Sequence, residues 1–478
     1  MALRRTWQSY DSTYRAEQME TLAGWILRGV SGAVVGMDGA GKSNFIGFLC
    51  HRPEIIRSYL PSEADSVALI PVDLNNLPPN ALSTFYRVIL RSFYEVRSRF
   101  EATLQQNITT LYLENRATRD PFLSHSALRE LLLHFQVEGV QIVLVMDHFD
   151  DFCESATPQM IATLRGLRDS FKDTLSYIVS TRKEVVYLAD PNILGKLYQI
   201  LDTHVCWVGP MNESDAKRVI SQEMQWSPTP LSEAEISHLL THIGGYPALL
   251  KAVCHWWLTT PDQPELNFIE NPSALIHTLL AERSIQSRLE EISAGLTQEE
   301  QLVLYEVQKL QTSDQKTEKA RAKDWAGLRK QHSQALKRLE AKGVCLRQQA
   351  GWHIFSDLFA AYIANIKRPG RGKIWLNEKT GTLYQGQTLL EKLPPTREAL
   401  LRFLVTHPYS RHTKTDLIVN AWPDDTRQYG ISDDSLFQAV RALRQKMEPN
   451  PAKPVYIVTW RGKPEGGYQF FPEGQPKA

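Results

Sequence analysis

One stretch near the N-terminus constrains the fold more than any other part of the chain. Residues 36–43 match G-x-x-x-x-G-K-[ST] without a mismatch, after an apolar run and before a segment with helical spacing. Phosphate-binding loops have this order because the glycines let backbone N–H groups turn inward onto phosphate oxygens at the start of a helix. We therefore predict an α/β core, a parallel sheet with flanking helices; an ordinary glycine-rich turn before a helix is the alternative.

The loop also predicts which residues hold a nucleotide. Lys42 would reach the β- and γ-phosphates, and the Ser43 hydroxyl would ligate Mg²⁺. The expected cofactors are therefore ATP or ADP with Mg²⁺. The predicted nucleotide-binding residues of the loop are Gly36, Gly39, Ala40, Gly41, Lys42, Ser43 and Asn44.

A second phosphate-site signature lies further along the chain. The apolar run 141–147 predicts a strand buried on both faces, and it ends in Asp147. An acid at the carboxyl end of such a strand would hold the Mg²⁺, mainly through water. Many ATPases carry a water-activating glutamate next, but this chain has His148, so Asp150 is the better candidate to position water and we expect slow hydrolysis. The alternative is that Asp150 and Asp151 only cap the next helix.

Another predicted strand, residues 175–182, ends at Arg182. In a parallel sheet its tip would lie beside the phosphates, where Arg182 could bind the γ-phosphate and report its presence. An ordinary surface arginine is the alternative. The remaining expectations for the core are strands over 33–35, 67–73 and 205–210, and one long helix over about 80–104.

From about Tyr14 to Tyr362 the motifs, in this order, resemble those of the STAND class of P-loop NTPases, relatives of the AAA+ ATPases. Tyr14-Arg15 resembles the upstream arginine motif of that class, and 180–182 its arginine sensor. Residues 209–216 resemble the start of its helical lid, and 244–250 match its G-x-P element. The resemblance implies that Arg15 contacts the nucleotide and that Pro247 packs on the adenine.

The resemblance further implies an ATP/ADP switch between a closed and an open state, with slow hydrolysis and homo-oligomerisation on ATP binding. STAND proteins usually carry an array of sensor repeats, and this chain has no internal period. The activator, a protein or a ligand, is therefore not identified. The usual phosphate-sensing histidine also has no clear equivalent, His353 being a weak candidate.

The C-terminal part differs from the rest in charge. From residue 367 onward it holds 18 Lys and Arg and 11 Asp and Glu, a formal charge of +7, whereas the preceding part carries −6. A basic module on an acidic body is typical of nucleic-acid binding, and an ordinary basic surface is the alternative. Residues 374–471 resemble the OmpR/PhoB-type winged helix-turn-helix, most specifically at 441–447, at 457–462 and at Gly467-Tyr468.

The third helix of this module has one apolar face, made by Leu436, Val440, Leu443 and Met447. The opposite face would present polar groups to base edges in the major groove of double-stranded DNA. Arg441 and Arg444 would contact phosphates or brace the helix, and Arg461 and Lys463 belong to the wing. The predicted DNA-binding residues are Ser435, Gln438, Arg441, Ala442, Arg444, Gln445, Arg461 and Lys463. Two departures from the pattern of the DNA-binding members count against tight, specific DNA binding: the acids Asp433 and Asp434, and the extra wing residues 463–465. The alternative is a winged helix that binds protein.

Several motifs and turns divide the chain into parts, in keeping with roughly 150 residues per domain. A capping box at Thr297 and Glu300, followed by helices and a hairpin, indicates a winged helix in the middle, for which a relay role is favoured over direct DNA binding. The predicted parts are a P-loop ATPase core (1–209), a helical lid (210–290), a winged-helix relay domain (291–366), a linker (367–373) and the winged helix-turn-helix domain (374–472).

Composition narrows the class of protein. Hydrophobic residues make up 42% and charged residues 22%, as in globular proteins, and no apolar run reaches the ~20 residues of a membrane span. The five cysteines are widely spaced, without a C-x-x-C pair, which indicates neither a disulfide framework nor a zinc site. We therefore expect a cytoplasmic protein that has no contact with membranes.

These observations favour an ATP/ADP-switched DNA-binding regulator, whose nucleotide state controls oligomerisation or DNA binding. The alternative is an ATP-dependent assembly factor, in anti-phage defence or transposition, whose winged helix docks a partner protein. A plain ATPase motor is disfavoured because His148 replaces the usual glutamate.

Overall fold

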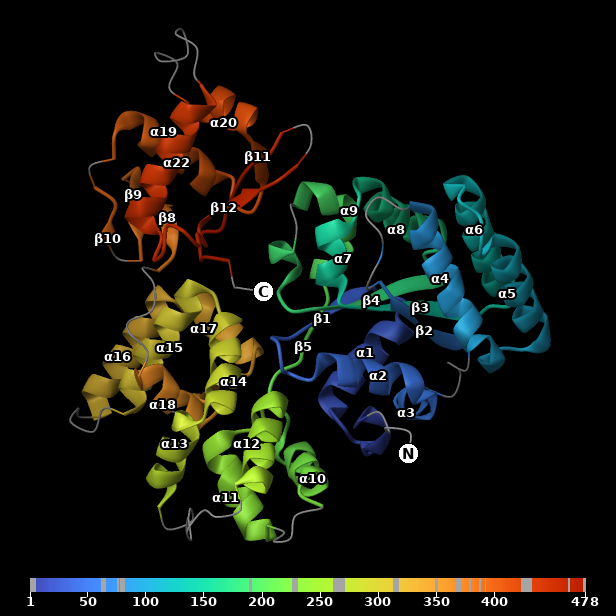
Figure 1. Cartoon of the computed structure of the whole chain (residues 1–478), viewed down its shortest axis with the longest axis horizontal. Coiled ribbons are helices and arrows are strands. Elements are labelled where there is room, and N and C mark those ends of the chain that lie inside the picture. The colour runs from blue at the N-terminus through green and yellow to red at the C-terminus, as the bar shows by residue number, and fades with distance from the viewer. Residues whose placement is uncertain are drawn as a thin grey trace. The chain divides into compact units, whose positions relative to one another are not determined.

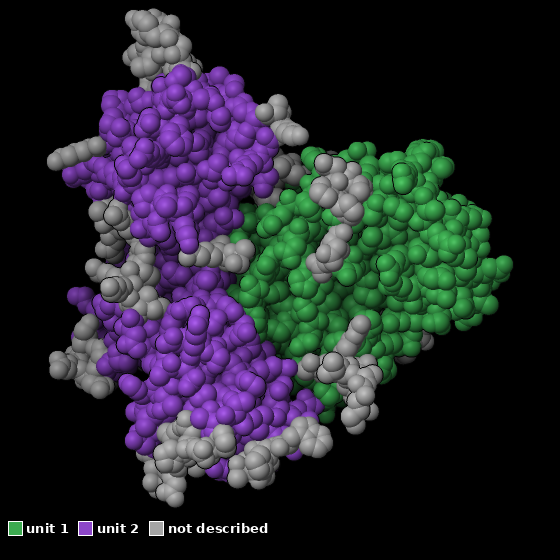
Figure 2. Space-filling model, in the orientation of Figure 1, with its two compact units in different colours: residues 1–215 green, residues 216–478 purple. Residues whose placement is uncertain are grey.

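The computed structural model describes residues 6–475 apart from 62–65, 75–76, 78–81, 189–190, 226–230, 261–270, 313–317, 349–350, 366–371, 378–379, 387, 392, 423–431 and 463–464. The chain forms two compact units, residues 1–215 and 216–478 (Figure 2). In the part of the chain described, no helix combines the length and the apolar character needed to cross a membrane.

Unit 1 is built on a five-stranded parallel sheet (Figure 1). The strands are β1 (Gly32–Val35), β2 (Val67–Asp73), β3 (Gln141–Asp147), β4 (Leu175–Thr181) and β5 (Val205–Trp207), in the order β2-β3-β4-β1-β5. Their interior positions are buried because helices cover both faces, as expected for a parallel sheet. The predicted strands and the parallel α/β class are therefore confirmed.

Helices flank the sheet in two layers. On one face lie α1 (Ala16–Leu27) and α2 (Lys42–His51), with α3 (Pro53–Ser58) after them. The other face carries an extended apolar core. The helices that contribute to it are α4 (Leu82–Val96), α5 (Ala102–Asn115), α6 (Pro121–Val137), α8 (Pro158–Ser170) and α9 (Pro191–Asp202), together with the short α7 (Phe149–Ser155).

The prediction of a single long helix over about 80–104 is wrong. The chain instead forms α4, a 3₁₀ turn at Arg97–Arg99 and α5 (Ala102–Asn115), which packs back on α4. The break follows Val96, the last buried residue of α4, and α5 starts after the extended residue Glu101. The apolar spacing continued across this turn, so periodicity alone could not locate it.

Unit 2 begins with two sets of helices, the second of which includes a two-stranded antiparallel sheet. The first set is α10 (Glu213–Glu223, which starts at the unit boundary), α11 (Glu233–Ile243), α12 (Pro247–Thr259), α13 (Pro272–Ala281) and α14 (Arg283–Ala294). The second set is α15 (Gln298–Gln311), α16 (Glu318–Gln331), α17 (Ser333–Ala341), β6 (Cys345–Gln348), β7 (Gly351–Ile354) and α18 (Asp357–Asn365). The predicted capping box is confirmed: Thr297 and Glu300 bond each other's backbone N–H groups at the start of α15.

The C-terminal part of unit 2 has its own apolar core. It contains β8 (Ile374–Asn377), β9 (Thr382–Gln385), β10 (Thr388–Leu389), α19 (Pro395–Thr406), β11 (Arg411–Thr413), α20 (Lys414–Ala421), α22 (Asp433–Met447), β12 (Ile457–Trp460) and β13 (Gly467–Phe470). β8, β9 and β10 form one antiparallel sheet, and β12 and β13 form the hairpin of the wing, with β11 on the other side of β13. This is the expected winged helix-turn-helix architecture.

Candidate nucleotide site and DNA interface

The phosphate loop connects β1 to α2, and its glycines are required by the backbone. Gly39 and Gly41 have φ values of 77° and 86°, a region that other L-residues rarely adopt. Gly36 lies so close to the segment after β5 that a Cβ on Gly36 would collide with the carbonyl oxygen of Val208. The loop can therefore curl tightly and bring its backbone N–H groups to the N-terminus of α2, which favours anions.

Lys42 lies over this loop. Its Nζ donates to the carbonyl oxygens of Gly36, at 2.5 Å, and Met37, at 3.2 Å. Burial lowers the pKa of Lys42, although the carboxylates of Asp38, Asp150 and Asp147 oppose the shift. An anion at the loop would offer the ammonium a stronger partner than two carbonyl groups, so the residues present fit a bound phosphate chain.

Arg15 lies next to the loop, and its side chain contacts the backbone of the loop. This residue is buried, has a φ of 50°, and its Nη2 donates to the carbonyl oxygens of Ala40 (2.7 Å) and Gly209 (2.9 Å). Its backbone N–H is bound by the carboxylate of Asp215 at 2.9 Å. In this arrangement Arg15 fixes the position of the phosphate loop, while its predicted contact with the nucleotide remains a prediction.

The sheet order brings two predicted residues and the phosphate loop to one edge of the sheet. β4 lies between β3 and β1, and its end pairs with both neighbours: Thr181 with Val35, and Val179 with Met146. The backbone N–H of Gly36 donates to the carbonyl oxygen of Thr181 at 3.1 Å. Asp147, Arg182 and the phosphate loop therefore stand at adjacent strand ends, where parallel α/β folds bind ligands.

Arg182 is held by two carboxylates at this edge. Its guanidinium forms ion pairs with Asp150 and Asp151, both in the first turn of α7. Burial opposes the charge of Arg182, but the hydrogen bond and the charge of Asp150 outweigh it and raise its pKa. Asp150 is itself buried, so its carboxylate serves Arg182, and its predicted role in positioning water has to compete with that ion pair.

The other predicted nucleotide residues divide between the two units. Ser43 is exposed at the start of α2 beside Asn44, and the Asp147 carboxylate accepts the backbone N–H of His148 at 3.0 Å. Ser43 and Asp147 are oxygen donors suited to Mg²⁺. Pro247 is buried at the first position of α12 in unit 2, and its contact with the adenine stays a prediction.

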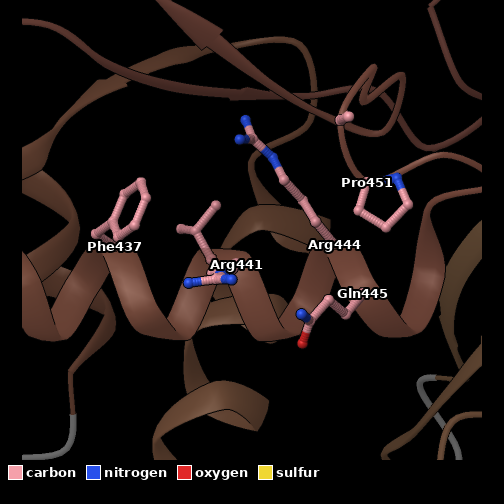
Figure 3. A pocket seen from close by; sticks show the side chains of 7 residues that line it. Phe437, Arg441, Arg444, Gln445 and Pro451 are labelled. Atoms are coloured by element: carbon pink, nitrogen blue, oxygen red, sulfur yellow. The ribbon is translucent and has the colours of Figure 1, made fainter.

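The exposed side of α22 carries the predicted base-reading residues. Ser435, Gln438, Arg441 and Gln445 are exposed, and Ala442 is half-buried. Four residues of α22 and Pro451 line a hollow of about 330 Å³. Figure 3 shows the four α22 side chains: Phe437, Arg441, Arg444 and Gln445. The buried face contains Leu436, Val440, Leu443 and Met447, as the spacing predicted.

Arg444 braces the wing. Its guanidinium donates twice to the carbonyl oxygen of Ile457, at 2.9 and 2.7 Å, and to Thr459 Oγ1 at 2.8 Å. Burial lowers its pKa. Of the two roles left open by the sequence, the structure therefore supports bracing. Arg461 is exposed after β12, whereas Lys463 lies outside the described residues.

The sequence analysis missed one feature of this surface, Phe437, and interpreted two others, Asp433 and Glu465, differently from what the structure shows. Phe437 was not predicted, yet 52% of it is exposed on α22. Asp433 pairs with Lys414 Nζ at 2.6 Å, and Glu465 of the wing accepts hydrogen bonds from the backbone N–H and the hydroxyl of Thr415 at the start of α20. These acids therefore have local partners, which explains their presence without requiring an acidic surface for protein docking.

Arg441 and Arg444 should respond differently to alanine substitution. Removing Arg444 leaves the Ile457 carbonyl without its charged donor, so we expect a loss of about 1–3 kcal/mol in the stability of the C-terminal domain. Removing exposed Arg441 should change stability by less than about 0.5 kcal/mol. Hydrogen exchange of β12 and β13 measures both effects; equal protection in the two variants would contradict the bracing role.

Comparison with known proteins finds a family match for the C-terminal domain. Residues 388–470 match the family described as "Transcriptional regulatory protein, C terminal". The response regulator GtcR of Aneurinibacillus migulanus is 30% identical over 99 residues, which cover 21% of this chain and 38% of that protein. The chain thus matches less than half the length of this curated relative.

Two solved structures are similar over most of their own length. One is the Walker-type ATPase paby2304 of Pyrococcus abyssi. Its sequence identity to this chain is 14%, the match covers 75% of this chain and 97% of that chain, and the TM-score is 0.40. The other is the ORC2 protein of Aeropyrum pernix. Its sequence identity is 14%, the match covers 73% of this chain and 92% of that chain, and the TM-score is 0.35.

The assignment of unit 1 rests on its own sheet order and on the loop between β1 and α2. The chain joins a P-loop α/β fold in its N-terminal part to an OmpR/PhoB-type winged-helix domain of transcriptional regulators at its C-terminus.

Proposed function

We propose that this protein is a DNA-binding regulator switched by ATP and ADP. The observation that carries the proposal is the presence, in one chain, of a phosphate loop with Asp147 and Arg182 at adjacent strand ends and of a domain that matches transcriptional regulators. The first part suits a nucleotide that is sensed, and the second suits double-stranded DNA.

In this proposal Arg182 distinguishes the two nucleotides. Lys42 and the loop N–H groups hold the phosphates, and Ser43 and Asp147 hold Mg²⁺, which supplies positive charge between the phosphate oxygens when bound. A γ-phosphate competes with Asp150 and Asp151 for the guanidinium of Arg182. Release of the two carboxylates at the start of α7 is then the local change that separates the ATP state from the ADP state. A STAND-like lid carrying Pro247 and homo-oligomerisation on ATP binding belong to the same proposal.

The experiment compares Arg182→Ala with wild type in calorimetric titrations of ADP and a non-hydrolysable ATP analogue. ADP affinity should be unchanged, whereas the analogue should bind about 10- to 100-fold more weakly, the equivalent of one charged hydrogen bond. Arg165→Ala is the matched control, because Arg165 pairs with Asp169 along α8. An equal loss for both nucleotides would contradict the sensor role, and wild type that binds neither would contradict the nucleotide proposal.

A second function is favoured by one observation. Phe437 places an exposed aromatic ring on the face of α22 that would enter DNA. An exposed aromatic side chain is also typical of protein–protein interfaces. The alternative is therefore an ATP-dependent assembly factor, in anti-phage defence or transposition, whose C-terminal domain docks a partner protein. It predicts ATP-dependent assembly without DNA binding.

A further inference from the structure

Unit 1 has a cavity of about 480 Å³ away from the phosphate loop. Val67 begins β2 and Val140 immediately precedes β3, and both line the cavity, so it lies at the amino ends of these parallel strands. The phosphate loop follows the carboxyl end of β1. The two sites are therefore at opposite edges of the sheet.

The cavity walls are mainly apolar. Ile56, Leu69 and Leu104 are buried in them, while Leu60 and Phe100 are half-buried. A volume of this size lies in the range of ~300–1,000 Å³ found for small-molecule sites, which are mostly apolar with a few polar groups. The walls suit the hydrocarbon part of a small molecule.

The polar lining is mainly cationic. Arg57 and Arg99 contribute two guanidinium groups, against one carboxylate from Glu101. Arg99 Nη1 donates to the carbonyl oxygen of Cys50 at 3.0 Å. Among the described residues, no carboxylate lies within ion-pair distance of either arginine; the charge of Arg57 acts on Glu54, whose carboxylate pairs with Arg52. Because guanidinium groups bind carboxylates in a bidentate manner, the cavity combines an apolar wall with an anion-binding rim.

We propose that this cavity binds an amphipathic monocarboxylate of the medium-chain fatty-acid type. The carboxylate pairs with Arg99 and Arg57, and the alkyl chain lies against Ile56, Leu69 and Leu104. This binding site does not depend on the proposed nucleotide function.

One helix links the cavity to the phosphate loop. Cys50, which lines the cavity, lies in the last turn of α2, whereas Lys42 is the first residue of that helix. A ligand that binds Arg99 binds the same guanidinium group that donates a hydrogen bond to the carbonyl oxygen of Cys50. Occupancy of the cavity therefore changes nucleotide affinity at the other end of α2; this consequence rests on the proposed function.

The test is calorimetric titration of decanoate into the full chain, with 1-decanol as the neutral probe of equal chain length. Arg99→Gln should lower decanoate affinity at least tenfold. The matched control is Arg97→Gln, because Arg97 lies two residues earlier, stacks on Tyr94 and donates to its carbonyl oxygen at 2.6 Å. Val67→Trp, at the half-buried start of β2, should abolish binding by filling the cavity. Circular dichroism checks that each variant is folded.

Each outcome decides the proposal. Decanoate binding that weakens at least tenfold in Arg99→Gln, disappears in Val67→Trp and is unchanged in Arg97→Gln supports it. Equal affinity for 1-decanol, or decanoate binding that Arg99→Gln does not change, overturns the carboxylate assignment, and absence of decanoate binding to wild type overturns the site. Lys42→Ala should still bind decanoate, so failure of the nucleotide proposal is distinguished from failure of this one. Unchanged ADP affinity with decanoate bound overturns the link through α2.

Discussion

Replacing Lys42 by alanine is expected to lower ATP affinity by about 100-fold or more. Lys42 is the one cation of the loop, and its Nζ already lies within 2.5 Å of the Gly36 carbonyl oxygen at the curl of the backbone. A buried ammonium that binds two phosphate oxygens contributes about 1.5–3 kcal/mol for each charged hydrogen bond. Fluorescence titration with a labelled ATP analogue measures the loss.

The matched control is Lys172→Ala, which removes an exposed lysine in the turn between α8 and β4. This variant should bind the analogue as wild type does. If Lys42→Ala also retains wild-type affinity and melts at the wild-type temperature, the loop between β1 and α2 is not a phosphate site.

The second large effect concerns a buried ionic cluster in the second set of helices of unit 2. Glu300 is fully buried, and its carboxylate accepts from Lys342 Nζ at 2.9 Å, Arg338 Nε at 3.0 Å and the backbone N–H of Thr297 at 2.7 Å. Neighbouring Glu299 pairs with His332 at 3.1 Å. One carboxylate therefore caps α15 and neutralises two cations, Arg338 in α17 and Lys342 directly after it.

Glu300→Ala is expected to destabilise this domain by about 3–5 kcal/mol, because it leaves two largely buried cations without their main partner. Hydrogen exchange in α15 and α17 should accelerate at least about 100-fold, since each 1.4 kcal/mol is a factor of ten. Glu306→Ala, on the exposed side of the same helix, is the control and should have little effect. Unchanged protection in Glu300→Ala would show that the cluster is not stabilising.

The same cluster predicts a pH dependence. Burial alone would raise the pKa of Glu300, but Lys342 and Arg338 outweigh it and hold the pKa below its ordinary value of 4.5. Because the folded-state pKa is depressed, the contribution of Glu300 is complete above pH 4.5 and is lost as the pH falls through the lower folded-state value. Protection of α15 should therefore decrease in acid in wild type, and much less so in Glu300→Ala.

The sequence allowed much of the core to be predicted, for identifiable physical reasons. The strands were continuous apolar runs, and Gly36, Gly39 and Gly41 occupy positions that the backbone geometry restricts to glycine. The capping box was also predictable, because its two residues act locally on one helix end. Such features depend on short stretches of chain.

What could not be predicted depends on tertiary contacts. Arg182 binds Asp150 and Asp151 only because β4 lies next to β3, and the sequence does not give the strand order. The partners of Glu300 come from α17 and the residue after it, and the cavity at Arg99 joins segments far apart in the chain. The break after Val96 was missed because the apolar spacing continues across it.

The most direct test of the central claim is the fluorescence anisotropy of a labelled mixed-sequence duplex. Wild type and Lys42→Ala are titrated with ADP or a non-hydrolysable ATP analogue, each at two salt concentrations. We expect wild type to bind DNA, with an affinity that falls with salt and differs between the two nucleotides, and Lys42→Ala to lose only the nucleotide dependence. DNA binding by wild type that is identical in both nucleotides, or absent in both, would contradict the account.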